Sequence, residues 1–328
     1  MSYALIADLG GTNARFALAP IGDTLVQEIR VLPCKEYDTL FLALDKYLSQ
    51  TSVSIESISA VVLAIAGPVN QTLIRFSNNP WQFTREDLAH YFGADKKLAL
   101  LNDFDAIGHS LDVLKQDDLV AVGDGQVDAS QPAWVVGAGT GLGVACVIPQ
   151  AEISYVLPGE GGHVDLTSCT EQEDYILGYL RERHHRVSAE RVLSGMGMEN
   201  IYAALAHKEG RLDRLTAPEI GEAFSAKEPL AMACMEQFFV YLGRIIGDLI
   251  LSVESRGGVY IAGGIVPRYL TAFIESGFRQ ALEEKGRMRH LVSAIPTFVV
   301  MAEHPGLIGC AKYASYLVKA SNNGDSNE

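Results

Sequence analysis

Short apolar runs alternate along the chain with stretches in which apolar residues recur at helical spacing. A run of roughly four to eight apolar residues bounded by glycine, proline or polar residues is typical of a buried strand, whereas apolar residues at i, i+3 and i+4 are typical of a helix. The strand-like runs span residues 3–7, 14–19, 60–66, 98–101, 134–136, 144–148 and 258–262. The helix-like stretches span residues 40–48, 85–92, 104–114, 170–183, 231–253 and 269–276. Strands that alternate with helices predict an α/β protein with a mixed sheet in each domain.

Glycine-rich turns follow three of the strand-like runs: DLGGTN at residues 8–13, GAGTGLG at residues 137–143 and GG at residues 263–264. The first two each join two strand-like runs and suggest an internal duplication. Glycine lets backbone N–H groups approach an anion closely, although any one of these turns alone is better explained as a tight hairpin. Together, and with neighbouring hydroxyl and carboxylate groups, they favour a nucleotide. The candidate nucleotide-binding residues are Asp8, Gly10, Gly11, Thr12, Asn13, Gly137, Gly139, Thr140, Gly141, Gly263 and Gly264.

These turns differ from the commonest nucleotide-binding motifs. The chain has no GxxxxGK[ST] sequence, which excludes a P-loop, and it has no protein-kinase signature set. The turn at residues 137–143 lacks the GxGxxG spacing and leads into a strand rather than a helix, which argues against a Rossmann dinucleotide site. Asp8 stands at the end of a strand, where it could hold Mg²⁺ directly or through water, or cap an Asx turn.

The composition narrows the class of protein. A chain of 328 residues with 48% hydrophobic and 20% charged residues predicts about two soluble domains. The net charge of −14 argues against a nucleic-acid partner. The chain shows no signal peptide, and its apolar stretches look shorter than the roughly 20 residues of a membrane span, so we expect a cytoplasmic protein without a membrane partner. The five cysteines are far apart, which favours reduced thiols over disulfides or a zinc site.

Asn102 and Asp103 stand between the strand-like run at residues 98–101 and the helix-like stretch that follows. Open α/β sheets bind ligands at the carboxyl ends of their strands. A carboxylate there can accept the proton of an attacking hydroxyl. The alternative role for Asp103 is to cap the following helix, and Asp105 competes with it for that role.

The motifs together resemble a known family. The first two glycine turns and GVYIAGG at residues 258–264 resemble the two phosphate motifs and the adenosine motif of the actin/hexokinase/Hsp70 ATPase superfamily. LNDF at residues 101–104, PGEGGHVD at residues 158–165 and SAERVLSG at residues 188–195 narrow the resemblance to bacterial glucokinases of the non-ROK type. The resemblance extends from residue 3 to about residue 317.

The resemblance implies a two-domain actin-like ATPase fold of the ribonuclease H-like type, an α/β fold with mixed sheets flanked by helices and an inter-domain cleft. A small domain would comprise residues 1–110 and 302–320, and a large domain residues 111–301. The last helix would thus return to the first domain, and the polar residues 321–328 would form a disordered tail. The resemblance also implies a homodimer.

The resemblance assigns roles to individual residues. Asp103 would be the catalytic base, and the sugar-binding residues would be Asn102, Asp103, Glu160, His163 and Glu190. Carboxylates accept hydrogen bonds from sugar hydroxyls, and Asn and His side chains can both donate and accept. The alternatives are that backbone groups satisfy His163 and that Glu190 is a first-turn acid of a helix. Asn78 and Asn79, near Trp81, are further candidates from the first domain.

The implied reaction is phosphorylation of glucose by ATP to give glucose 6-phosphate, with Mg²⁺ held at Asp8. Segments 102–105, 158–165 and 188–190 contain no Lys or Arg. A phosphorylated or carboxylated substrate would call for such a residue, so the site suits a neutral sugar. The alternatives are a kinase of another neutral hexose such as fructose or mannose, an actin- or chaperone-like ATPase switch, and a catalytically silent sugar sensor.

Overall fold

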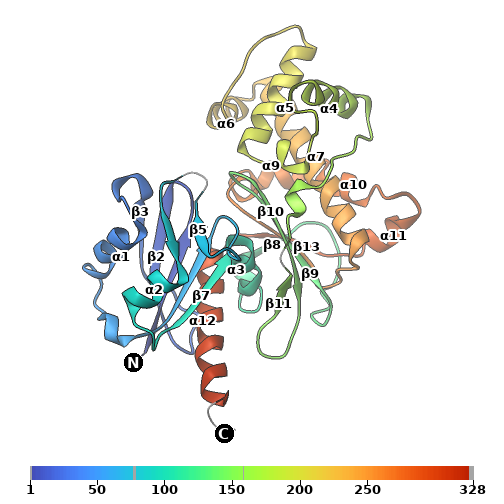
Figure 1. Ribbon diagram of the computed structural model, residues 1–328. Coiled ribbons are helices and arrows are strands. Elements are labelled where there is room, and N and C mark those ends of the chain that lie inside the picture. Colours follow the sequence, from blue (N-terminus) through green and yellow to red (C-terminus); the bar gives the residue numbers. More distant parts are fainter. Residues whose placement is uncertain (1, 77–78, 158, 325–328) are drawn as a thin grey trace. The chain divides into compact units, whose positions relative to one another are not determined.

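The computed structural model describes residues 2–76, 79–157 and 159–324, which form two units (Figure 1). The first unit comprises Met1–Lys115, Pro149–Pro158 and Ala302–Glu328. The second comprises Gln116–Ile148 and Gly159–Met301. The chain therefore leaves and re-enters the first unit, and each unit contains its own main sheet.

The main sheet of the first unit has the strand order β3-β2-β1-β4-β7. Its strands are β1 (Tyr3–Leu9), β2 (Asn13–Pro20), β3 (Gln27–Pro33), β4 (Ile58–Ile65) and β7 (Lys97–Asn102). β1 and β2 form the predicted antiparallel hairpin, whereas β4 runs parallel to β1 and β7 runs parallel to β4. The carboxyl ends of β1, β4 and β7 therefore lie at one edge of the sheet, the edge at which open α/β sheets bind ligands.

Each face of this sheet has its own core, because side chains alternate between the two faces of a strand. On one face, Leu5 and Leu9 join a cluster of large side chains that includes α1 (Leu40–Leu48). On the other face, alanines of β1, β2 and β4 pack with α12 (Pro305–Gly324), and these small residues allow the helix to lie close to the sheet. The remaining α-helices and strands of this unit are α2 (Arg85–Phe92), α3 (Asp103–Ser110), β5 (Leu73–Arg75), β6 (Gln82–Thr84) and β11 (Tyr155–Leu157).

The segment Pro149–Pro158 belongs to the first unit, whereas the sequence prediction placed it in the large domain. Ser154 donates from its backbone N and its Oγ to the carboxylate of Asp112, over 3.0 and 2.6 Å. Lys312 Nζ donates to the backbone oxygen of Glu152 over 3.1 Å. These bonds join residues far apart in sequence, so no local pattern could have predicted them.

The C-terminal helix is longer than the sequence predicted. α12 continues to Gly324, whereas the disordered tail was expected to begin at residue 321. The residues after the predicted end are Ser321, Asn322 and Asn323, and none of them is a proline or a glycine that would end the helix before Gly324. The last four residues of the predicted tail lie outside the described residues.

Helices α3 and α12 approach each other closely at Gly309, where a Cβ atom would overlap the carbonyl oxygen of Ala106. Because only a shift of a helix could relieve this overlap, we expect Gly309→Ala to lower the free energy of unfolding by about 1–3 kcal/mol. Gly306→Ala is the matched control, since its Cβ would lie 4.0 Å from Ile107 Cγ1, and alanine favours a helix. Urea unfolding measures the difference, and equal midpoints for the two variants would contradict the prediction.

The strands of the second unit repeat this arrangement: within a six-stranded sheet of order β11-β10-β9-β12-β13-β8, they are the five from β10 to β8. These strands are β8 (Leu119–Ala121), β9 (Ala133–Ala138), β10 (Leu142–Ile148), β12 (Gly258–Ala262) and β13 (Thr297–Val300). β9 and β10 form an antiparallel hairpin, and β12 and β13 follow in parallel beside β9, as β4 and β7 do beside β1. The repeated topology agrees with the duplication that the two glycine turns suggested.

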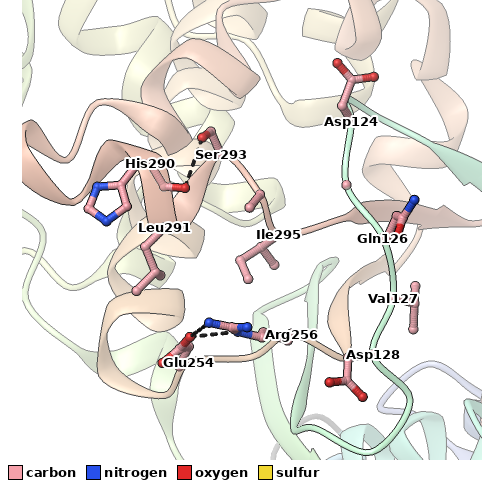
Figure 2. A pocket seen from close by; sticks show the side chains of 12 residues that line it. Asp124, Gln126, Val127, Asp128, Glu254, Arg256, His290, Leu291, Ser293 and Ile295 are labelled. Carbon is pink, nitrogen blue, oxygen red and sulfur yellow. Dashed lines mark hydrogen bonds and ion pairs between the residues drawn. The ribbon is translucent and has the colours of Figure 1, made fainter.

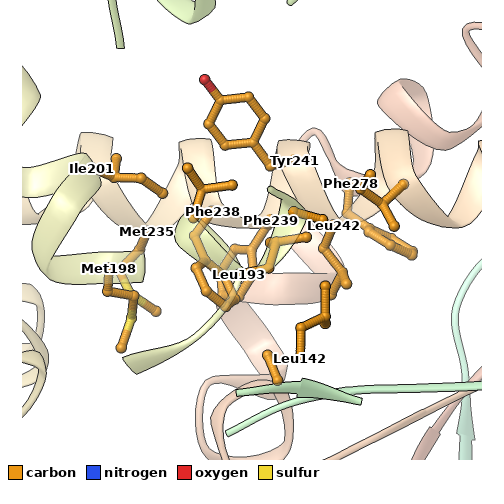
Figure 3. Packing of buried hydrophobic residues seen from close by; sticks show 14 of the residues in the cluster. Leu142, Leu193, Met198, Ile201, Met235, Phe238, Phe239, Tyr241, Leu242 and Phe278 are labelled. Carbon is orange, nitrogen blue, oxygen red and sulfur yellow. The ribbon is translucent and has the colours of Figure 1, made fainter. Parts of the chain in front are cut away.

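The core of the second unit is built around one long helix, α7 (Pro229–Ser252) (Figure 3). Phe238, Phe239 and Leu242 of this helix are buried against side chains that include Leu142 of β10 and Phe278. The other helices of this unit are α4 (Glu171–His184), α5 (Gly195–Lys208), α6 (Ala217–Ser225), α8 (Ile265–Arg268), α9 (Leu270–Glu275), α10 (Phe278–Glu283) and α11 (Arg289–Val292).

Helix α7 corrects one expectation from the sequence. It is the one helix among the described residues that is long and apolar enough to cross a membrane, with a mean hydropathy of 1.3 over its most apolar window. The sequence pattern predicts no apolar stretch of that length. However, 78% of this window is buried inside the protein, and Arg244 forms a buried ion pair with Glu173 at 2.9 Å. A helix that is apolar on most sides is typical of a protein core as well as of a membrane.

Candidate active site

The first group of candidate residues lies where β1 ends. Asp8 faces Arg15 across the β1–β2 hairpin, and Arg15 Nη1 lies 3.1 Å from Asp8 Oδ2. Burial raises the pKa of Asp8, and the charge of Arg15 and its hydrogen bond oppose that rise. No sequence motif marks Arg15, although the pairing of two strands across a short turn could have placed it opposite Asp8.

The turn between β1 and β2 is closed by backbone hydrogen bonds. Gly10 N donates to Asn13 O over 3.1 Å, and Cys34 N donates to Thr12 O over 2.8 Å. Asn79 Nδ2 donates to Gly10 O over 3.5 Å, and the ring of Trp81 is buried. Asn79 therefore lies beside the phosphate motif, while Asn78, its predicted companion, lies outside the described residues.

Asn102 and Asp103 lie at the carboxyl end of β7, as the sequence predicted. The Oδ1 atoms of both side chains accept the backbone N–H of Phe104, each over 3.0 Å. Asn102 is the N-cap of α3, and Asp105 accepts a hydrogen bond from the backbone N–H of Asn102. Asn102 and Asp105 thus cap the start of α3. Asp103 contributes only its Oδ1 atom there, and its Oδ2 atom takes no part in capping.

The surroundings of Asp103 raise its pKa to about 6. Burial is the largest cause, followed by the negative charge of Asp8, while backbone N–H donors partly offset the rise. Asp8 is the next-to-last residue of β1 and Asp103 directly follows β7. Both strands run parallel to β4 in the same sheet, which explains why the two carboxyl groups influence each other. A carboxylate with a pKa near neutrality is suited to accept a proton from a substrate hydroxyl.

The second group lies in the second unit, where three of the predicted sugar-binding side chains come together. His163 Nε2 lies 3.8 Å from Glu160 Oε2, and His163 Nδ1 lies 4.0 Å from Glu190 Oε1. The side chains of Glu160 and His163 are 82% and 54% exposed, so they are open to a ligand. The imidazole of His163 therefore faces two carboxylates, rather than being satisfied by the backbone. Asn102 and Asp103, the other predicted sugar-binding residues, belong to the first unit.

Glu190 lies in a 3₁₀ turn (Ala189–Arg191) that precedes α5, not in the first turn of an α-helix as the alternative interpretation had it. Its Oε2 atom accepts the backbone N–H of Leu142 over 3.0 Å. The carboxylate thus reaches the start of β10, 48 residues earlier in the chain.

Arg186, which no sequence motif marks either, supports the loop that carries His163. Arg186 Nη2 donates to the backbone oxygen of His163, and its Nε donates to Asp165 Oδ1, each over 2.6 Å. On the other side of the loop, a Cβ on Gly162 would overlap the carbonyl oxygen of Leu142. Glycine therefore allows this loop to lie directly against β10.

The second phosphate motif forms the turn between β9 and β10. Gly139 N donates to Gly141 O over 2.8 Å, and Thr140 is exposed at the turn, whereas Gly137 is buried within β9. Gly263 follows β12 with a φ of +85°, and a Cβ there would lie 2.6 Å from Ala138 O. The proposed phosphate and adenosine motifs therefore follow two neighbouring parallel strands of one sheet.

The described residues offer few side chains for binding a metal ion. In the part of the chain that the structure describes, no group of three or more His, Cys, Asp and Glu side chains could hold a metal ion. Asp8 offers a carboxylate at the end of β1, close enough to Asp103 for the two charges to affect each other. Mg²⁺ is usually bound by one or two carboxylates, with water and substrate phosphates completing its coordination, so the carboxylate of Asp8 fits this ion.

The second unit also contains a cavity of about 640 Å³ (Figure 2), and none of the candidate residues lines it. It is lined by side chains near the amino ends of β12 and β13, among them Arg256 and Ile295, and Arg256 pairs there with Glu254. The phosphate and adenosine motifs follow the carboxyl ends of strands, where ligands of α/β sheets bind. The cavity therefore contains none of the candidate residues.

The comparisons with known proteins agree with these motifs. The family model "Glucokinase" matches residues 5–317. A glucokinase of Psychromonas ingrahamii is 39% identical over 317 residues, covering 94% of this chain and 96% of that protein. A glucokinase of Pseudomonas paraeruginosa is 42% identical over 309 residues, covering 93% and 90%. The crystal structure of a glucokinase from an Antarctic psychrotroph superposes with a TM-score of 0.85 at 32% identity, covering 96% of this chain and 99% of that one. With this match over nearly its whole length, the chain belongs to the glucokinase family.

Proposed function

We propose that this protein is a glucokinase that transfers the γ-phosphoryl group of ATP to the 6-hydroxyl of glucose. Family membership over nearly the whole chain supports the activity. The main structural support for this reaction is the position of Asp103 at the carboxyl end of β7, together with its pKa, which is raised to about 6. We infer that it accepts the proton of the 6-hydroxyl as that oxygen bonds to the γ-phosphorus and the bond from phosphorus to the β,γ-bridging oxygen breaks.

The base need not be strong for this reaction. In a loose phosphoryl-transfer transition state, the proton of the nucleophile leaves late. Correct orientation of the hydroxyl therefore matters more than the driving force for proton transfer. The hydrogen bond from Phe104 N to Asp103 Oδ1 holds the carboxylate in one orientation and supports this role.

The phosphates of ATP would be held by the two hairpin turns. We propose that backbone N–H groups at Gly11, Thr12 and Asn13, and at Thr140 and Gly141, surround the phosphate oxygens. The N–H groups of Gly10 and Gly139 close the two turns, Gly137 supports the second turn, and Gly263 and Gly264 would lie near the adenosine. Backbone donors of this kind explain how an acidic protein can bind an anionic nucleotide. Mg²⁺, when bound through water to Asp8, would neutralise charge on the phosphates.

The sugar would be held by Asn102, Glu160, His163 and Glu190, together with Asp103. His163 and its two carboxylate neighbours form a set of donors and acceptors that suits the hydroxyls of a neutral hexose. We also propose that the protein works in the cytoplasm as a homodimer. The family resemblance supports the dimer, and the five free cysteines support a reducing compartment.

Initial rates with a panel of sugars test this function. In an assay that couples ADP release to a detectable signal, we expect kcat/KM to be highest for glucose and lower for mannose and fructose. A higher kcat/KM for fructose would show that the protein is a kinase of another hexose. ATP turnover at the same rate without any sugar would instead favour the ATPase switch, in which the sugar-loop residues have no role.

A further inference from the structure

Glu190 contacts both of the proposed substrate subsites within the second unit. Its Oε1 atom lies 4.0 Å from His163 Nδ1 in the sugar loop, and its Oε2 atom accepts the N–H of Leu142 over 3.0 Å. Leu142 is the first residue of β10 and follows the phosphate turn directly. One carboxylate is therefore shared between the loop that would hold the sugar and the turn that would hold the phosphates.

The segment that carries Glu190 also holds the turn at a second point. Gly195 N donates to Gly139 O over 2.9 Å, and Gly139 N in turn donates to Gly141 O over 2.8 Å. Ser194, which is fully buried, donates from Oγ to the backbone oxygen of Glu190 over 2.9 Å. The phosphate turn is thus bonded at both of its ends to residues 190–195.

Gly141 allows this close contact. A Cβ built on Gly141 would lie 2.5 Å from Glu190 Oε2, closer than atoms approach without one of them moving. The atom that would move is the end of a flexible side chain, so an alanine at this position would displace the carboxylate from Leu142 N rather than disrupt the backbone. A Cβ on Gly139, in the same turn, would meet no atom within 4 Å.

We propose that Glu190 couples glucose binding to ATP binding through its hydrogen bond to Leu142 N, with Gly141 as the positioning residue that makes this bond possible. The inference rests on the proposed function. A glucose hydroxyl that bonds to Oε1 restricts the carboxylate, and the restricted carboxylate holds the phosphate turn in the conformation seen here. Binding of either substrate then orders Glu190 and the phosphate turn in advance, so the second substrate binds at a lower entropic cost. The coupling is therefore positive and reciprocal.

Calorimetric titration of the full-length protein with AMPPNP, with and without saturating glucose, tests the proposal. We expect glucose to lower the Kd for AMPPNP about 5-fold or more in the wild-type protein, within the usual range of coupling between sites. In Gly141→Ala, the ratio of the Kd without glucose to the Kd with glucose should fall to within about 2-fold of unity. Gly139→Ala is the control: it can weaken nucleotide binding, but it should retain the wild-type ratio, because it leaves Glu190 in place.

Three results would overturn the proposal. A ratio near unity in the wild-type protein would show that no coupling exists. A wild-type ratio in Gly141→Ala would show that the coupling arises elsewhere, for example from movement of the two units. Equal loss in both variants would show that the turn itself, not its contact with Glu190, transmits it. If the wild-type protein neither binds nor phosphorylates glucose, the proposed function fails first, so the two failures are distinguishable.

Discussion

Replacement of Asp103 by asparagine is expected to lower kcat by at least about 10²-fold, the lower end of the range for loss of a general base. The dissociation constant for glucose should remain within about 10-fold of the wild-type value. Asparagine keeps the size of the side chain and an oxygen that can accept the N–H of Phe104, so helix α3 keeps its contact at this point. The amide cannot accept the proton of the 6-hydroxyl, so the loss should fall on the chemical step.

Single-turnover phosphorylation and glucose binding, measured on the same preparation, separate these two effects. Asp105→Asn is the matched control, because Asp105 is a second carboxyl group two residues away that bonds to the backbone of Asn102 instead of remaining free for a substrate. We expect its kcat to stay within a few-fold of the wild-type value. A wild-type kcat for Asp103→Asn would remove Asp103 from the mechanism.

Local sequence patterns predicted much of the fold. The apolar runs and glycine turns located both hairpins, and the position of Asp103 between an apolar run and a helical stretch placed it at the carboxyl end of β7. The helical spacing of apolar residues also predicted helix α7, but it did not predict that the helix is apolar enough over its length to cross a membrane. These features succeed because they depend on neighbours within a few residues, where spacing directly determines which side chains share a face.

The features that the sequence did not predict depend on contacts between distant segments. The bond from Leu142 N to Glu190 spans 48 residues, and Arg186 supports His163 through backbone oxygen, which any residue carries. The assignment of Pro149–Pro158 to the first unit depends on Asp112 and Lys312. In the candidate site, the sequence motifs identified the functional side chains. The residues that position those side chains could be identified only from the three-dimensional structure.

The second large expected effect is a loss of activity in acid. Because Asp103 must be ionised to accept a proton and its pKa is raised to about 6, kcat/KM for glucose should be level above pH 7 and fall below pH 6. The decline should approach tenfold per pH unit, to about a tenth of the plateau at pH 5. An aspartate with its ordinary pKa of 3.8 would show no such decline until below pH 4.

The same pKa predicts the opposite trend for stability. A carboxyl group whose pKa is higher in the folded than in the unfolded protein binds its proton more tightly when folded, so it contributes stability at low pH that is lost as the pH rises through about 6. Asparagine at this position cannot ionise. Asp103→Asn should therefore be more stable than the wild-type protein at pH 7, and the difference should shrink toward pH 4.

Rate profiles and urea unfolding of the wild-type protein, Asp103→Asn and Asp105→Asn at pH 4 to 8 test both trends together. The residual activity of Asp103→Asn should lack the acid limb, while Asp105→Asn should shift it slightly toward lower pH, because Asp105 adds to the negative charge near Asp103. An acid limb that persists in Asp103→Asn would belong to another group. If the acid limb disappears while stability at pH 7 rises, one partly buried carboxyl group accounts for both, and the protein keeps a destabilising charge because catalysis requires it.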